Sequence, residues 1–144
     1  MREYLLTLVL LTTAVYAEAN CRPPWPQDRE CFRQQTIYFS TASPFLRSET
    51  RKEITEVASF LRDHPQWAVL IEGHCDDRGS GGHNRWLGER RALAVRSELI
   101  RAGVSPERID TISFGKERPA AVGHDAKARQ RNRRVEFTLL TPPR

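Results

Sequence analysis

The sequence has few cysteines and histidines, the residues that most often bind zinc. It holds three cysteines and four histidines, and neither a Cys-x-x-Cys nor a His-x-x-x-His spacing occurs. Zinc sites are commonly built from such spacings. His74, Cys75, Asp76 and His83 lie close in sequence, but adjacent residues of a strand point to opposite faces, so His74 and Cys75 would not share an ion. The sequence therefore predicts neither a metal nor a cofactor.

Long hydrophobic runs are absent beyond the N-terminal residues. The one such run, from Leu5 to Val15, follows a short basic start and precedes small residues. It is too short to span a bilayer comfortably, so residues 1–19 are predicted to be a secretory signal and the product to be periplasmic. Cleavage after Ala17 or after Ala19 fits the small-x-small rule, and we favour Ala19.

The scarcity of cysteine also limits cross-linking. In an oxidising compartment Cys21 and Cys31 could form a disulfide around a proline-rich loop, which we favour over the alternative that all cysteines are free. Cys75 is predicted to be a lone, partly buried thiol. A lipid-attachment cysteine normally follows a Leu-small-small run, and Glu18 and Asn20 before Cys21 fit that pattern poorly. A soluble protein is therefore predicted, rather than one tethered to the outer membrane through a lipid on Cys21.

The overall composition is that of an ordinary globular protein, with 39% hydrophobic and 28% charged residues. Residues 35–141 are predicted to form a single domain, and the proline-rich residues 20–34 an irregular arm. Removal of the signal, which carries Arg2, Glu3 and Glu18, changes the formal net charge from +5 to +6. A basic protein is attracted to anionic surfaces, and export argues against nucleic acid as the partner.

Periodicity in the sequence predicts the order strand, helix, strand, helix, strand, strand. Apolar residues recur with helical spacing over residues 48–64 and 84–102, where Asn84 could cap the second helix and Gly103 could end it. Strands are predicted at residues 36–40, 67–71, 109–114 and 135–140. This order packs most simply as a mixed four-stranded sheet with two helices on one face, a two-layer α/β fold.

Two charged residues stand where a ligand site is expected. Arg91 lies on the apolar stripe of the second helix, four residues after Leu87, where it either reaches out from the edge of the stripe or presents a fixed cation to a pocket. Asp76 follows the interior strand, and ligands gather at the carboxyl ends of strands in α/β sheets. Alone it would be an ordinary loop carboxylate. Together the two charges could hold a zwitterion, with ammonium on Asp76 and carboxylate on Arg91.

Several blocks of the sequence resemble the signature of the OmpA C-terminal-like domain family. These blocks occur in the family's order, and the resemblance runs from about residue 36 to residue 140. Within this family the likeness is greatest to the peptidoglycan-associated lipoproteins (Pal). The blocks are Glu72–Gly79, Leu87–Ala92, Ser113–Pro119 and Asn132–Glu136.

The resemblance implies a non-enzymatic protein that binds peptidoglycan stem peptides through diaminopimelate and is associated with the cell wall. It assigns the contacts with the zwitterionic end of diaminopimelate to Asp76 and Arg91. It also implies a periplasmic Tol-system β-propeller as a partner. Cys75 departs from the family, which has a small or hydroxylated residue there. The further residues that resemble the family's pocket lining are Gly73, His74, Asn84, Leu87, Asn132 and Arg133.

Three alternatives stay open at this point. The domain could act mainly as a protein-interaction module, with wall binding secondary. A hydrolase would need a nucleophile beside a base, and Cys75 with His74 or His83 is the one available arrangement. The arginines at positions 129, 131, 133 and 134 form either a solvated entry to the last strand, which we accept for the first two, or an electropositive rim.

Overall fold

The computed structural model describes residue 32 and residues 35–140. The predicted signal at residues 1–19, the Cys21–Cys31 pair and the predicted arm, apart from its residue 32, lie outside the described residues. The elements are β1 (Thr36–Tyr38), α2 (Ser48–Asp63), β2 (Ala68–His74), α3 (Gly81–Arg101), the 3-10 turn η1 (Pro106–Arg108), β3 (Ile109–Gly115), α4 (Ala126–Asn132) and β4 (Arg134–Leu140).

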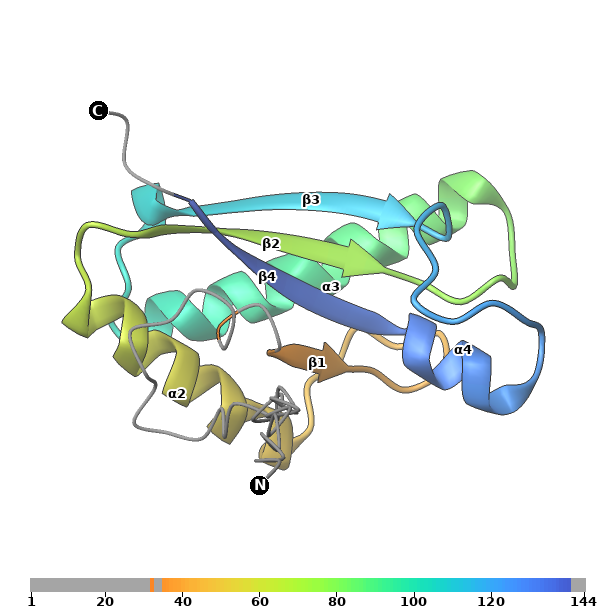
Figure 1. Cartoon of the computed structure of the whole chain (residues 1–144), viewed down its shortest axis with the longest axis horizontal. Helices are drawn as coiled ribbons and strands as arrows, with labels where there is room; N and C mark the ends of the chain where they lie inside the picture. The colour runs from red at the N-terminus through yellow and green to blue at the C-terminus, as the bar shows by residue number, and fades with distance from the viewer. Residues whose placement is uncertain (1–31, 33–34, 141–144) are drawn as a thin grey trace, which may run out of the picture.

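The four strands form one mixed sheet in the order β1-β4-β2-β3. Strands β2 and β3 are parallel, and β4 runs antiparallel to both β1 and β2. Helices α2 and α3 lie together on one face of this sheet (Figure 1). The predicted two-layer α/β fold with a mixed four-stranded sheet is therefore confirmed.

The core lies between the sheet and these two helices, and the predicted apolar faces fill it. The helical stripe of α2 is buried, as the spacing of Ile54, Val57 and Leu61 predicts. In β4, Val135 and Phe137 alternate with more exposed residues and point into the same core. Each such side chain contributes about 1.5–3 kcal/mol of burial free energy.

Phe32 extends the folded unit beyond the predicted domain boundary at residue 35. It has helical backbone and is 1% exposed. Its ring centroid lies 5.0 Å from that of Phe60 and 6.1 Å from that of Phe137. The core thus contains a side chain from the segment that was predicted to be an irregular arm.

Two predicted element ends around the interior strand are wrong. Strand β2 continues to His74, three residues beyond the predicted end. Helix α3 begins at Gly81, because the hydroxyl of Ser80 accepts a hydrogen bond from the backbone N–H of His83 at 3.2 Å and caps the helix. Asn84 is therefore in the first turn of α3 and does not cap it. Gly103 follows α3 with a positive φ of 97°, as predicted.

Helix α4 is the element that the sequence did not reveal. It lies between the last two strands, in a polar and basic stretch where the sequence analysis predicts no helix or strand. Asp125 caps it by accepting a hydrogen bond from Ala128 N–H at 2.7 Å. Five of its seven residues are polar and the other two are alanines, so this short helix shows no recognisable apolar periodicity.

The described helices include none that is both long enough and apolar enough to cross a membrane.

Candidate ligand-binding site

A cavity of about 300 Å³ opens at the carboxyl end of β2, beside the first turns of α3. The loop after β1 closes its other side. Asp76 and Arg91 both line it. The full lining is Thr41, Ala42, Cys75, Asp76, Arg78, Gly79, His83, Asn84, Leu87, Arg91 and Arg133.

Arg91 is completely buried, with 0% of its surface exposed. Its guanidinium donates to three backbone carbonyls: those of Ser40 and Ser43, each at 3.0 Å, and that of His74 at 2.9 Å. The guanidinium therefore fixes the loop after β1 against the end of β2. The alternative that Arg91 reaches out to solvent from the edge of the apolar stripe is wrong.

These three hydrogen bonds use only some of the N–H groups of the Arg91 guanidinium. A guanidinium has five N–H groups. A fourth faces the sulfur of Cys75 at 3.6 Å, a long and weak contact, and one N–H on Nη2 is free of any hydrogen bond to the described residues. Burial of Arg91 lowers its pKa, but an arginine stays charged in proteins. Arg91 can thus organise the cavity and still present a cation to it.

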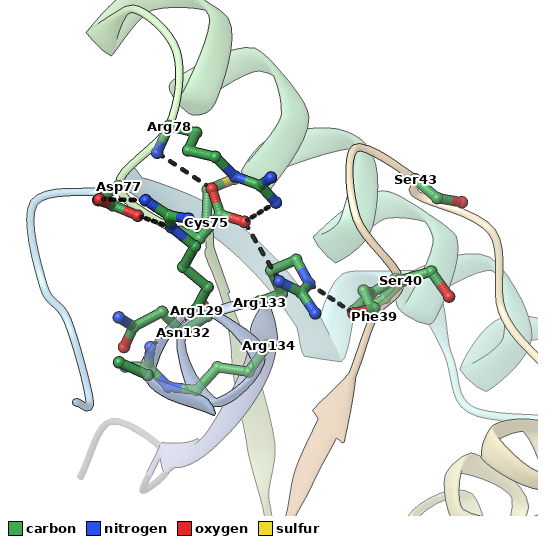
Figure 2. A network of polar contacts seen from close by, with 12 residues as sticks. Phe39, Ser40, Ser43, Cys75, Asp77, Arg78, Arg129, Asn132, Arg133 and Arg134 are labelled. Atoms are coloured by element: carbon green, nitrogen blue, oxygen red, sulfur yellow. Dashed lines mark hydrogen bonds and ion pairs between the residues drawn. The ribbon is translucent and has the colours of Figure 1, made fainter. Parts of the chain in front are cut away.

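The carboxylate of Asp76 is held from two sides. The backbone N–H of Arg78 donates to Oδ1 at 3.1 Å, and its guanidinium donates to Oδ2 at 3.1 Å. The guanidinium of Arg133 reaches the same Oδ2 at 3.3 Å (Figure 2). Burial of Asp76 opposes ionisation, yet these hydrogen bonds lower its pKa below the ordinary value. Within the described part of the chain, no ion pair joins Asp76 to Arg91.

Three of the residues expected to line the pocket do line this cavity: Asn84, Leu87 and Arg133. The side chain of Asn84 donates to the carbonyl of Arg78 at 2.7 Å and so fixes the loop that follows β2. Arg133 also donates to the carbonyl of Phe39 at 3.1 Å, which ties the loop after β1 to the start of β4. These contacts hold the walls of the cavity in place.

Gly73 and His74 lie outside the cavity. A Cβ on Gly73 would stand 1.9 Å from the carbonyl oxygen of Gly88, so this glycine allows α3 to pack closely on β2. The ring of His74 is buried against Phe114, with ring centroids 5.6 Å apart. Neither ring nitrogen has a hydrogen-bond partner among the described residues. Desolvation, together with the nearby guanidinium of Arg134, lowers the pKa of His74 to about 4.

Asn132 also lies outside the cavity. Its side-chain oxygen accepts hydrogen bonds from the backbone N–H groups of Ala120 and Ala121 at 2.8 and 2.9 Å. It lines a separate hollow of about 190 Å³, which shares Cys75 with the first cavity. Asn132 thus shapes the loop before α4 and does not face Asp76.

Sequence reasoning missed two residues beside the cavity, Arg78 and Asp77. Arg78 follows Asp76 by two residues, and only the turn of the loop brings its guanidinium back to the carboxylate. Asp77 forms an ion pair with Arg129 of α4 at 2.7 Å (Figure 2). It also contacts Nδ1 of His124 at 2.6 Å. The hydrogen bonds from Arg129 and then His124 hold the pKa of Asp77 well below its usual range. The expectation that Arg129 is merely solvated is therefore wrong.

The geometry gives no support to a hydrolase or to a metal site. Cys75 is buried, and its thiol donates to the carbonyl of Asn84 at 3.2 Å. Desolvation raises the pKa of this thiol, which disfavours the reactive thiolate. The ring of His74 packs on Phe114 and offers it no base. Across residue 32 and residues 35–140 there is no group of three potential metal ligands.

A two-layer α/β domain with a charged cavity at the carboxyl end of β2 is the class that this geometry defines. The chain belongs to the OmpA family, whose model matches residues 38–133. The resemblance predicted from the sequence blocks is thereby confirmed. The OmpA-like and Pal proteins are a non-enzymatic family, in agreement with the prediction that the chain is not an enzyme.

Relatives named as peptidoglycan-associated lipoproteins match at substantial identity. The protein of Mesorhizobium japonicum is 42% identical over 103 residues, which cover 72% of this chain and 61% of that protein. The protein of Pseudomonas aeruginosa is 45% identical over 102 residues, which cover 71% of this chain and 60% of that protein. The chain therefore spans about 60% of the length of these curated relatives.

Solved structures agree with the fold. The crystal structure of the peptidoglycan-associated lipoprotein from Burkholderia pseudomallei superimposes with a TM-score of 0.72 at 34% identity, covering 74% of this chain and 91% of that one. The C-terminal domain of Helicobacter pylori MotB gives a TM-score of 0.70 at 25% identity, covering 74% and 84%.

Proposed function

We propose that this chain binds peptidoglycan non-covalently, through the zwitterionic end of a diaminopimelate residue in the stem peptide. In this proposal Asp76 accepts hydrogen bonds from the ammonium and Arg91 donates to the carboxylate. The observation that carries it is that a carboxylate and a guanidinium line one cavity without pairing to each other. The names of the relatives, which are peptidoglycan-associated lipoproteins, support the choice of ligand.

The size and chemistry of the cavity suit the end of one side chain. A volume of about 300 Å³ is at the lower limit of ligand pockets, too small for a whole stem peptide. Charge-assisted hydrogen bonds contribute about 1.5–3 kcal/mol each. Loss of either charged partner should therefore weaken binding roughly tenfold or more.

Co-sedimentation with purified, insoluble peptidoglycan tests the proposal. We expect the wild-type protein to sediment, and Asp76→Asn to raise its apparent dissociation constant roughly tenfold or more. Arg91→Lys keeps a positive charge at the cavity but loses the forked geometry, and it should weaken binding similarly. Asp110→Asn is a matched control, because Asp110 is an exposed carboxylate on β3 outside the cavity. Undiminished binding by both cavity variants would refute the proposed clamp.

A protein partner is a second candidate, and exposed aromatic side chains favour it. Phe45 is 81% exposed and Trp86 is 56% exposed. Trp86 lies next to the cavity, because its ring centroid is 6.0 Å from that of His83, which lines the cavity. An envelope protein such as a Tol-system β-propeller could bind there. In that case the wild-type protein would stay in the supernatant when peptidoglycan is sedimented. Trp86→Ala would weaken capture of the β-propeller.

The proposed location is the periplasm, in association with the cell wall. The predicted signal at residues 1–19 supports export, and a wall-binding domain would then be retained there. The intact mass of the protein purified from the envelope tests both points. We expect a chain that starts at Asn20, or at Glu18, with no lipid on Cys21. A mass increased by a diacylglycerol group would show instead that the protein carries a lipid anchor.

A further inference from the structure

The cavity carries more positive charge than a single zwitterion requires. It is lined by three guanidinium groups, from Arg78, Arg91 and Arg133, and by one carboxylate, from Asp76. With His83 neutral, these groups sum to +2. A zwitterionic group adds no net charge when it binds. The lining thus favours a ligand that brings at least one further carboxylate.

The three arginines differ in how firmly the protein holds them. Arg91 donates to three backbone carbonyls and is fully buried. Arg133 donates to the carbonyl of Phe39 as well as to Asp76, and only 13% of its side chain is exposed. The side chain of Arg78 is 48% exposed, and among the described residues its guanidinium hydrogen-bonds to Asp76 alone. Arg78 is the one cation here that can leave its partner by rotating its side chain.

The backbone of Arg78 does not need to move for this to happen. Its carbonyl accepts a hydrogen bond from Asn84 at 2.7 Å, and its N–H donates to Oδ1 of Asp76 at 3.1 Å. These two contacts hold the loop, while the guanidinium reaches across to Oδ2 (Figure 2). An ammonium that binds Oδ2 of Asp76 would compete with this guanidinium for the same oxygen.

We propose that the Arg78 guanidinium is an exchangeable counter-ion, which leaves Asp76 when the ammonium of the ligand binds and then pairs with a second carboxylate of the stem peptide. This rests on the proposed function of the same cavity. The exchange replaces one internal ion pair by two intermolecular ones: ammonium with Asp76, and carboxylate with Arg78. Arg78 is thereby a specificity residue for stems with a free carboxylate beside the zwitterionic end. Two groups supply such a carboxylate, the α-carboxyl of the D-glutamate and the stem-side carboxyl of diaminopimelate itself.

Isothermal titration with three synthetic peptides tests the exchange. The first is L-Ala-γ-D-Glu-meso-diaminopimelate with all carboxylates free, and the other two carry an amide on one or the other candidate carboxyl. We expect wild-type protein to bind the free form roughly threefold to tenfold more tightly than one of the amides, which identifies the source. In Arg78→Gln this ratio should fall toward one, and the discriminated amide should bind at least as tightly as it does to wild type, because Asp76 is released. Arg78→Lys should restore part of the ratio.

Arg85→Gln is the matched control, because Arg85 is an exposed arginine that pairs with Glu117 and does not line the cavity. It should keep the wild-type ratio. The inference is overturned if wild type binds all three peptides equally, or if Arg78→Gln weakens all of them by one common factor, as a merely structural residue would. If the wild-type protein binds none of the peptides, both this inference and the proposed function are refuted. If wild type binds them all equally and Asp76→Asn abolishes binding, the proposed function stands and only the role of Arg78 is refuted.

Discussion

Nη1 of Arg91 lies 2.9 Å from the carbonyl oxygen of His74, and this bond joins the middle of α3 to the last residue of β2. The same guanidinium also holds the loop after β1 through Ser40 and Ser43. Three segments distant in sequence therefore meet at one buried cation. The position of Asp76, two residues beyond His74, depends on this junction.

The first prediction concerns the stability of that junction. Arg91→Ala leaves three backbone carbonyls without their donor, so we expect the free energy of unfolding to fall by about 3 kcal/mol or more. Arg91→Lys should lose less, because a lysine can still reach one carbonyl. Urea denaturation followed by circular dichroism measures both. The neighbouring exposed residue gives the control: Arg90→Ala should change stability by about 0.5 kcal/mol or less. A loss no larger than that in Arg91→Ala would contradict the structural role.

A second prediction compares Gly73, where β2 packs closely on α3, with Gly81, in the exposed first turn of α3. Gly73→Ala places a Cβ 1.9 Å from the backbone oxygen of Gly88, so α3 must move away from β2. We expect the free energy of unfolding to fall by about 2–3 kcal/mol or more. Ligand binding should also weaken, because Asp76 follows β2 and Arg91 lies on α3, and these two elements would move apart. Gly81→Ala meets no atom within 4 Å in the first turn of α3 and should be neutral or slightly stabilising. Equal melting temperatures for the two variants would show that the close approach is not needed.

The sequence predicts the helices and strands better than it predicts the contacts made by loops. The apolar period places Ile54 and Leu61 in the core, and the same period places Arg91 on the inner face of α3. The buried face of a long helix can be predicted because it depends only on the spacing of apolar residues along the sequence. The contact of Arg78 with Asp76 depends instead on how a loop turns. Phe32 was missed for a related reason, since a single aromatic residue in a polar segment has no pattern to mark it.

The third prediction tests where the folded unit begins. Phe32 is buried between Phe60 and Phe137, so Phe32→Ala should lower the free energy of unfolding by about 3–5 kcal/mol. A chain that starts at Gln35 should be destabilised to a similar degree, whereas one that starts at Asn20 should be fully stable. Phe45→Ala is the control, since that phenylalanine is exposed on the surface. If the chain that starts at Gln35 melts at the same temperature as the longer one, the domain boundary predicted at residue 35 is correct and Phe32 is dispensable.

The last prediction follows from the buried ring of His74. The pKa of this imidazole is lowered from 6.5 to about 4, first by desolvation and then by the guanidinium of Arg134, while Glu136 acts in the opposite direction and Arg118 adds a smaller lowering. Because the folded pKa is the lower one, the unfolded chain binds the proton more readily between these two values. The contribution to stability is complete above pH 6.5 and is lost as the pH falls toward 4.

We therefore expect the wild type to lose about 1–3 kcal/mol of its free energy of unfolding between pH 6.5 and pH 4 through this residue. Urea denaturation at closely spaced pH values measures the slope. His74→Phe keeps a ring against Phe114 and has no proton to bind, so its stability should fall less steeply over the same range. Carboxylates that titrate near pH 4 affect both proteins alike, and the difference between the two curves isolates His74. Parallel curves would mean that the imidazole is protonated as easily in the folded chain as in the unfolded one, and that solvent reaches its ring.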